Sequence, residues 1–254
     1  MKPQNRERIV GLILVLAFIF SGCAAEKAYR EKQARGARDL GENFLARNEN
    51  SKALEQFLKA EEIYPEDPYL QYDLALTYDR KGLLDKAEHH LEEAIAMKPD
   101  YSDAYNYLGV IYFRQGKVNQ AITAYNKALE NLLYTKPQDA HYHLGIVYMS
   151  LKEYQKAKAH LEEAIRLVPD FVAAYTILGE VYEGLGQYSK ARYSYEQALR
   201  INPEYIDAYL NLGKLLYKSG EREKASKCFD KVIRLEPRSD RAQEALRYLR
   251  ALGK

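Results

Sequence analysis

The sequence predicts an all-α solenoid of six helix–turn–helix repeats followed by a C-terminal capping helix, and three regularities predict it. A small residue recurs every 34 residues, with one interval of 36, and Phe, Tyr or Leu always follows three residues later: Gly41, Ala75, Gly109, Gly145, Gly179 and Gly213. Twelve residues after each of these, the chain has alanine. Proline closes five of the units, at 65, 99, 169, 203 and 237, where it stops the second helix.

The packing of each unit follows from its spacing when the recurring small residue is numbered position 8. Positions 4, 7, 8 and 11 then share one face of the first helix, and position 24 of the second helix is large and apolar in every unit. Small residues at positions 8 and 20 allow the two helices to approach closely. The spacing resembles the tetratricopeptide repeat (TPR), which implies two antiparallel helices in every 34 residues.

The repeat also divides the chain. The six predicted units span 34–67, 68–101, 102–137, 138–171, 172–205 and 206–239. Residues 240–254 are expected to form an amphipathic helix whose polar outer face caps the open end of the solenoid. Ahead of the first unit, we expect a signal peptide over residues 1–22 and a short polar tether over residues 23–33 that merges into the first helix.

The N-terminal residues are typical of an exported lipoprotein. A basic start precedes the twelve-residue apolar run 9–20, which is too short for a transmembrane helix but suits a secretory signal. The run ends in Ser21-Gly22-Cys23, which resembles the bacterial lipobox and implies acylation of Cys23. Ala24 in place of Asp implies an outer-membrane anchor that faces the periplasm. The alternatives are an ordinary signal peptide with a chance cysteine, or a cytosolic adaptor.

Charge and cysteine content limit the classes of partner. The chain has 38 basic and 36 acidic residues among 254, and removal of residues 1–22 leaves a near-neutral protein. A neutral protein has no long-range attraction for phosphate backbones, so we do not expect a nucleic-acid partner. After acylation of Cys23, Cys228 has no cysteine to pair with, and we expect it to fill space in the sixth unit.

The sequence shows no pattern for enzymatic chemistry. Nucleophile, phosphate-loop and zinc-protease motifs are absent, and the repeats leave almost no residues to house a separate catalytic domain. Two of the five histidines, His90 and His160, fall at position 23, which we expect to face outward, and no Cys or carboxylate stands at ligand spacing beside them. We therefore predict no metal site, no cofactor, no small-molecule substrate and no enzyme activity.

Binding of a protein suits the scaffold better. In proteins with this resemblance, positions 2, 5, 9, 12 and 13 of the first helices line the concave surface, away from the packing face. The alternative is that some of these side chains pack between neighbouring helices. No unit has the Lys and Asn that clamp a C-terminal carboxylate. The candidate partner-binding residues in the central units are Tyr69, Tyr72, Leu76, Asn106, Val110, Phe113, Arg114, Tyr142, Ile146 and Met149.

The one long interval adds two residues to the connection between the third and fourth units, which reads Leu133-Tyr134-Thr135-Lys136-Pro137. An ordinary loop insertion would explain it. Together with the lipobox and six units, however, the connection resembles the type IV pilus biogenesis lipoproteins of the PilF/PilW family. That resemblance implies a pilotin, an outer-membrane-anchored adaptor that binds the pilus secretin and promotes its localisation and multimerisation, with Leu133 and Tyr134 as a second contact. The alternative in the same class is a scaffold lipoprotein that docks peptidoglycan or envelope-assembly enzymes.

Overall fold

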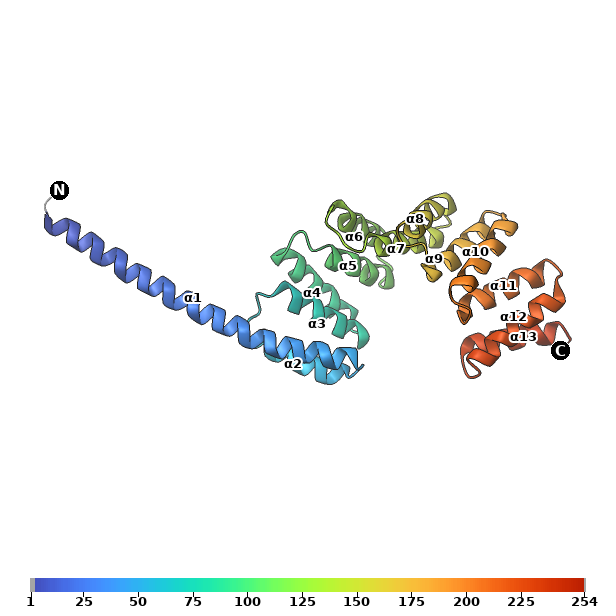
Figure 1. Ribbon diagram of the computed structural model, residues 1–254, viewed down its shortest axis with the longest axis horizontal. Coiled ribbons are helices and arrows are strands. Elements are labelled where there is room, and N and C mark those ends of the chain that lie inside the picture. Colours follow the sequence, from blue (N-terminus) through green and yellow to red (C-terminus); the bar gives the residue numbers. More distant parts are fainter. Residues whose placement is uncertain (1–2, 254) are drawn as a thin grey trace. The chain divides into compact units, whose positions relative to one another are not determined.

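The computed structural model describes residues 3–253, with side chains from Ala25 onward, and these residues form helices joined by short turns and no strand (Figure 1). The all-α architecture predicted from the sequence is confirmed. Among the described residues, no helix is both long and apolar enough to cross a membrane. The helices are α1 Pro3–Ala46, α2 Asn50–Ile63, α3 Pro68–Arg80, α4 Leu84–Met97, α5 Ser102–Arg114, α6 Val118–Glu130, α7 Pro137–Ser150, α8 Tyr154–Leu167, α9 Val172–Gly184, α10 Tyr188–Ile201, α11 Ile206–Lys218, α12 Arg222–Leu235 and α13 Asp240–Ala251.

The chain divides into two compact units, Met1–Gln115 and Gly116–Lys254, called unit 1 and unit 2 here. The six helix pairs that the sequence predicts are called repeats from this point on. In unit 1, α1 packs against α2, α3 against α4, and each pair against the next helix. In unit 2, the pairs α7–α8, α9–α10 and α11–α12 stack in order, and α13 packs against both α12 and α11. Each unit is therefore a stack of antiparallel helix pairs.

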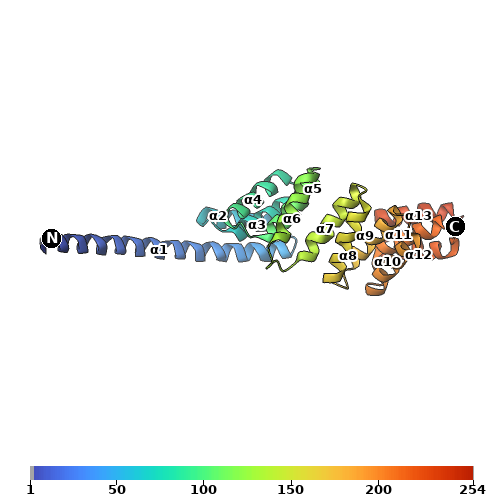
Figure 2. The ribbon, with the colours of Figure 1, turned by 90° about the horizontal axis from the view of Figure 1, so that it is seen from above.

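The first and last helices meet their stacks through specific contacts. Toward the N-terminus α1 runs on beyond α2 (Figure 2), so that residues 25–33 are helical. Within this part, Arg30 donates from Nε to the carbonyl of Ile63 at 2.9 Å. At the other end, the Ser239 hydroxyl caps α13 by accepting from the amide of Ala242 at 3.1 Å. The ring of Tyr248 then stacks on Phe229 with centroids 4.9 Å apart.

A left-handed residue at position 15 turns the chain between the two helices of every repeat. Glycine fills this position four times, with φ between 71° and 81°, whereas Asn48 and Lys152 adopt φ of 59° and 60°. The second repeat shows how the turn closes, because the amide of Gly82 donates to the carbonyl of Asp79 at 2.8 Å and that of Leu83 to Tyr78 at 2.9 Å. Such bonds satisfy the last carbonyls of the first helix.

The core of each repeat lies where position 8 of the first helix meets position 24 of the second. A Cβ atom added to Gly145 would lie 2.6 Å from Cγ of Leu161, and one added to Gly213 would lie 2.7 Å from the ring of Phe229. The large side chain thus rests directly on a glycine backbone. Because the alanines at position 20 are fully buried beside it, the two helices approach more closely than larger residues would allow.

Candidate interaction surfaces

In unit 1 two of the candidate residues, Tyr69 and Tyr72, belong to a group of four rings with Tyr101 and Tyr107, called the tyrosine cluster here. The centroid of the Tyr72 ring lies 5.4 Å from that of Tyr101 and 5.9 Å from that of Tyr107. Tyr69 lies 5.3 Å from Tyr101, edge to face. Tyr101 is buried, whereas Tyr69 is 45% exposed and Tyr72 is half-buried. The cluster therefore has a packed base and an accessible side.

The other candidate residues of unit 1 are also accessible. Leu76, Asn106, Val110 and Phe113 are half-buried. Arg114 is exposed and bonds the carboxylate of Asp79, which also accepts from the Tyr107 hydroxyl at 2.6 Å. None of the seven candidates in this unit is fully buried, as a binding surface requires, although several also pack on neighbours as the alternative interpretation expects.

Beside the tyrosine cluster, one guanidinium faces three carboxylates. Arg38 of α1 bonds Asp67 at 2.6 Å and Glu42 at 3.1 Å, and its Nε lies 3.8 Å from Asp73. Burial and the neighbouring Glu42 carboxylate raise the pKa of Asp73 to about 8, against the opposing influence of Arg38. The ammonium of Lys98 lies 4.8 Å from the ring centroids of both Tyr69 and Tyr101.

In unit 2, the candidate residues of α7 lie partly on the core. The Tyr142 ring packs against Phe171 with centroids 5.0 Å apart, and both Tyr142 and Met149 contact the buried core of that unit. Ile146 is half-buried. The sequence predicts one surface shared by the aromatic residues of α3, α5 and α7. Since α3 and α5 belong to unit 1 and α7 to unit 2, this sharing stays a prediction.

The long connection between α6 and α7 exposes two leucines. Leu132 and Leu133 are 97% and 86% exposed, whereas Tyr134 is half-buried. The backbone here is held by a turn, in which the amide of Leu133 donates to the side chain of Asn131 at 2.9 Å and the amide of Tyr134 to its carbonyl at 3.0 Å. Two adjacent, solvated leucines on an ordered turn are a candidate contact for a partner.

The prediction that position 23 faces outward is wrong. His90 of α4 is 9% exposed and its ring stacks on Tyr78 at 5.1 Å, and His160 of α8 is half-buried against Tyr148 at 5.4 Å. The physical reason is helical spacing, because positions 20, 23, 24 and 27 follow the i, i+3, i+4, i+7 pattern of one apolar face. The sequence contains a signal for this, since Ala124, Ser194 and Cys228 occupy the same position in other repeats.

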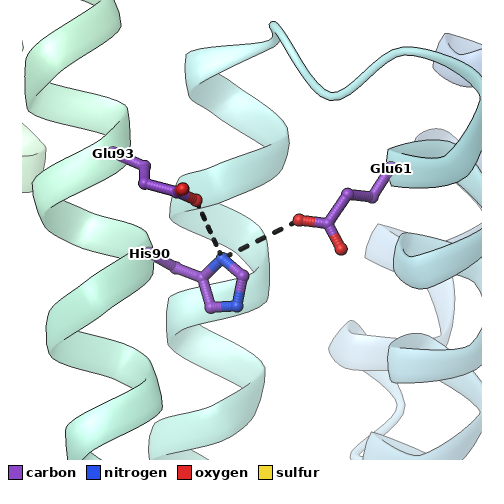
Figure 3. Close-up of side chains that lie close together, drawn as sticks. All are labelled: Glu61, His90 and Glu93. Carbon is purple, nitrogen blue, oxygen red and sulfur yellow. Dashed lines mark ion pairs between the residues drawn. The ribbon is translucent and has the colours of Figure 1, made fainter.

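His90 also has carboxylates within reach, contrary to the sequence prediction. Figure 3 shows Glu61 of α2 and Glu93 of α4 directed at Nδ1 of His90, and their oxygens lie 4.0 and 3.6 Å from it. The three groups are close enough to suggest a metal site. However, the side-chain oxygen of the buried Gln71 lies only 2.6 Å from the same Nδ1, where a metal would need to be about 2 Å away.

Gln71 thus makes this group a hydrogen-bond network. With Nδ1–H of His90 donating to the Gln71 oxygen, the Gln71 amide nitrogen donates to Glu61 and to the carbonyl of Pro65, both at 3.2 Å. Burial lowers the pKa of His90, which favours its neutral form. These bonds connect α2, α3 and α4, and we assign the network to packing.

Of the two cysteines, only Cys228 has a side chain that the structure describes. Cys23, the predicted lipidation site, lies outside the residues whose side chains are described. Cys228 is buried, and burial raises the pKa of its thiol to about 11. A thiol that stays protonated at neutral pH is a poor nucleophile, so the environment of Cys228 suits packing better than redox chemistry.

Family models of the tetratricopeptide repeat match most of the chain. One model matches residues 72–140, a second matches residues 139–171 and 206–239, and a TPR repeat model matches residues 184–220. Together these matches cover more than half of the chain. They agree with the helix pairs in both units.

Solved structures share the fold over most of this chain. The structure of pilF from Pseudomonas aeruginosa is 21% identical, with a TM-score of 0.73 over 85% of this chain and 97% of that one. The structure of PilW, described as a widely conserved type IV pilus biogenesis factor, is 20% identical, with a TM-score of 0.77 over 84% and 98%. YrrB, described as a TPR protein with an unusual peptide-binding site, is 25% identical, with a TM-score of 0.55 over 75% and 97%.

Curated relatives are longer proteins. The anaphase-promoting complex subunit CDC16 of Saccharomyces cerevisiae is 28% identical over 146 residues, which are 55% of this chain and 17% of that protein. The chain spans between 17% and 33% of the length of this and two similar relatives, a co-chaperone and a BBSome subunit. These relatives therefore match the repeat and not a whole protein.

Proposed function

Because this chain is a tetratricopeptide-repeat solenoid, a scaffold that mediates contacts between proteins, we propose that it is a pilotin for type IV pili. In this role it binds the pilus secretin and promotes secretin localisation and multimerisation at the outer membrane. The observation that carries the proposal is the likeness to pilF and PilW, which extends over nearly the whole of both proteins. The long α6–α7 connection and the lipobox support it.

The proposed anchor is an acylated Cys23. Each buried methylene of an acyl chain contributes about 0.8 kcal/mol, so several chains hold a protein stably where one does not. Residues 25–33 continue as helix into the first repeat, where Lys27 pairs with Glu66 of the α2–α3 connection and Arg30 bonds the carbonyl of Ile63 at the end of α2. The anchor would therefore hold the first repeat close to the membrane surface.

The proposed partner surface consists of the half-buried aromatic residues of the first helices. Large aromatic side chains with one packed and one accessible side commonly dominate binding energy, because they bury much area and lose little conformational entropy. Tyr72 and Tyr142 have this arrangement in units 1 and 2. Leu132 and Leu133 supply the second proposed contact, since burial of two exposed leucines removes a large apolar area from water.

The test of the surface is a double substitution, Tyr72→Ala with Tyr142→Ala, in cells that assemble the secretin. Truncation of one dominant aromatic residue costs on the order of 2 kcal/mol of binding free energy, so the yield of secretin multimers should fall severely while helical content and membrane anchoring stay normal. Tyr193→Ala is the matched control, because Tyr193 of α10 is 61% exposed and lies on a second helix. Leu133→Asp with Tyr134→Ser should have a smaller effect.

Normal multimer yield in a double variant that folds and stays anchored would exclude this surface. A pull-down from solubilised envelope then separates the two scaffold functions. Capture of secretin supports the pilotin, whereas capture of peptidoglycan or envelope-assembly enzymes without secretin supports the alternative scaffold.

The test of the anchor is Cys23→Ser. This variant should lose labelling by a fatty-acid probe and accumulate as precursor or soluble protein. Cys228→Ser is the control that keeps labelling, because the buried Cys228 thiol is not the proposed acceptor. Unchanged labelling and membrane partitioning of Cys23→Ser would contradict the lipidation proposal.

A further inference from the structure

The tyrosine cluster of unit 1 stands beside a local excess of negative charge. Among the residues whose side chains are described, Arg38 is the one guanidinium that pairs with Glu42, Asp67 and Asp73, at 3.1, 2.6 and 3.8 Å. The charged groups around the cluster come from every neighbouring element: Arg38 and Glu42 of α1, Asp67 of the α2–α3 connection, Asp73 and Asp79 of α3, Lys98 and Asp100 of the α4–α5 connection, and Asp103 and Arg114 of α5. Carboxylates outnumber the basic groups in this set.

Two of these carboxyl groups, Asp73 and Glu42, both lie near Nε of the Arg38 guanidinium. Burial and the nearby Glu42 carboxylate raise the pKa of Asp73, and Arg38 is within 4 Å of both carboxyl groups. Their side chains are 13% and 47% exposed, so the pair can be reached from solvent through Glu42. One guanidinium facing three carboxylates does not neutralise them, and a second cation would reduce the remaining negative charge.

The rings beside this pair already hold cations of the protein itself. The ammonium of Lys98 lies over Tyr69 and Tyr101 and donates to the Tyr69 hydroxyl at 2.9 Å. The guanidinium of Arg38 also lies near the Tyr69 ring, 5.7 Å from its centroid. Contacts of this kind are attractive because the ring face carries partial negative charge. The surface therefore combines aromatic faces with carboxylates that outnumber the nearby basic groups.

We infer that this surface binds an arginine or lysine side chain of the partner, whose stem packs on Tyr72 while its charged head contacts Glu42 and Asp73. The inference rests on the proposed function and adds the chemistry of the partner: a basic residue within an apolar or aromatic segment. Charge complementarity selects this occupant, because an acidic segment would add to the existing excess of carboxylates. Tyr101 contacts both the aromatic and the acidic part of the surface, since it packs on Tyr72 and interacts electrostatically with Asp73.

Binding of the cation should release a proton. In the free protein the pKa of Asp73 is about 8, and a bound guanidinium lowers it, because the opposite charge favours the ionised carboxyl. At pH 6, binding must therefore remove a proton from Asp73. Well above pH 8, Asp73 has already lost this proton. Affinity should rise as the pH increases from 6 to 8 and level off above it.

The experiment selects ligands from a phage-displayed library of random ten-residue peptides on the immobilised mature protein. Selected sequences should be enriched in arginine or lysine next to apolar residues. In a synthetic copy of a selected peptide, replacement of arginine by the neutral citrulline should weaken binding at least tenfold. Asp73→Asn and Glu42→Gln should each weaken the arginine peptide similarly, and Asp73→Asn should also abolish the pH dependence.

Asp39→Asn is the matched control, because Asp39 is an exposed acidic residue of the same helix α1. It should leave affinity and pH dependence unchanged. Asparagine resembles the protonated form of Asp73, so Asp73→Asn should fold, and Glu42→Gln provides a second variant at a more exposed position. Selected peptides without basic residues, equal binding of the citrulline peptide, or failure to select any peptide would overturn the inference.

The results also separate this inference from the proposed function. If arginine peptides bind but no secretin is captured from the envelope, the surface is correctly identified and the pilotin function fails. If secretin multimers form normally with the Glu42→Gln and Asp73→Asn variants, the pilotin function stands and the basic-residue site is overturned.

Discussion

The ring of Tyr72 packs against the ring of Tyr101 with centroids 5.4 Å apart, and Tyr142 packs against Phe171 in the same relation at 5.0 Å. In both pairs, a residue at position 5 meets the last residue of its own repeat. The first repeat has an ion pair at the equivalent positions, between Arg38 and Asp67 at 2.6 Å. The side chain at position 5 therefore links the first helix of its repeat to the connection that follows the second helix, while the other side of this side chain stays accessible.

This relation predicts energetic coupling between Tyr142 and Phe171. In a double-mutant cycle with Tyr142→Leu and Phe171→Leu, the two substitutions should interact by about 0.5–1.5 kcal/mol, because an aromatic pair contributes this much beyond its buried area. Urea denaturation of the four proteins measures the coupling. Strictly additive losses would show that the rings only fill space.

Gly145→Ala should destabilise the fourth repeat by about 1–3 kcal/mol of unfolding free energy. The added Cβ would lie 2.6 Å from Cγ of Leu161, a branch point that cannot swing away as a flexible chain end can. Gly36→Ala is the matched control, since no atom lies within 4 Å of its added Cβ and alanine favours a helix by about 0.5–1 kcal/mol. Thermal melts of both variants decide the point, and equal melting temperatures would contradict the tight contact.

Lys152→Gly should stabilise the protein by about 0.5–1 kcal/mol. Lys152 has φ of 60°, where a side chain costs about 1–2 kcal/mol, and glycine removes that cost at the expense of a more flexible unfolded chain. The reverse change, Gly186→Lys, should destabilise the fifth repeat, because Gly186 occupies the same position with φ of 71°. Chemical denaturation of both variants measures the effect, and a loss of stability in Lys152→Gly would refute it.

Acid should weaken the fold through His143. Burial lowers the pKa of His143 to about 4, against about 6.5 in an unfolded chain. Above pH 6.5 His143 is neutral in both the folded and the unfolded protein, so no stability is lost. As the pH falls from 6.5 to 4, only the unfolded state gains the proton, so the free energy of unfolding decreases, by up to about 3 kcal/mol.

His143→Phe keeps a ring against Tyr125, whose centroid lies 5.3 Å from that of His143, and should reduce this pH dependence. His90, His141 and His160 also have pKa values that burial lowers, so part of the slope should remain. His89→Gln serves as the control, because the His89 side chain is 66% exposed. Denaturation at several pH values between 4 and 7 measures the slopes, and identical slopes for wild type and His143→Phe would count against the assignment.

Several features of the surfaces were not predicted from the sequence, although some left a trace in it. Tyr101, Phe171 and Tyr205 end the second, fourth and fifth repeats, and this recurrence could have indicated the aromatic contact with position 5. The inward orientation of His90 could have been found from the small residues at position 23 in other repeats. The raised pKa of Asp73 has no such trace, since it depends on the burial of this carboxyl and on the nearby Glu42 of another helix.

The sequence by itself determined the helix pairs, their number and the position of the long connection, because those depend on spacing, helix propensity and turn residues that repeat along the chain. Only the tertiary structure decided that Gln71 occupies the space in front of His90, that Leu132 and Leu133 face solvent, and that three carboxylates surround Arg38. The physical reason is range. Periodicity is a local property of the sequence. Hydrogen bonding, exposure and pKa depend instead on side chains from neighbouring repeats, about thirty residues apart in the sequence, which come together only when the chain folds.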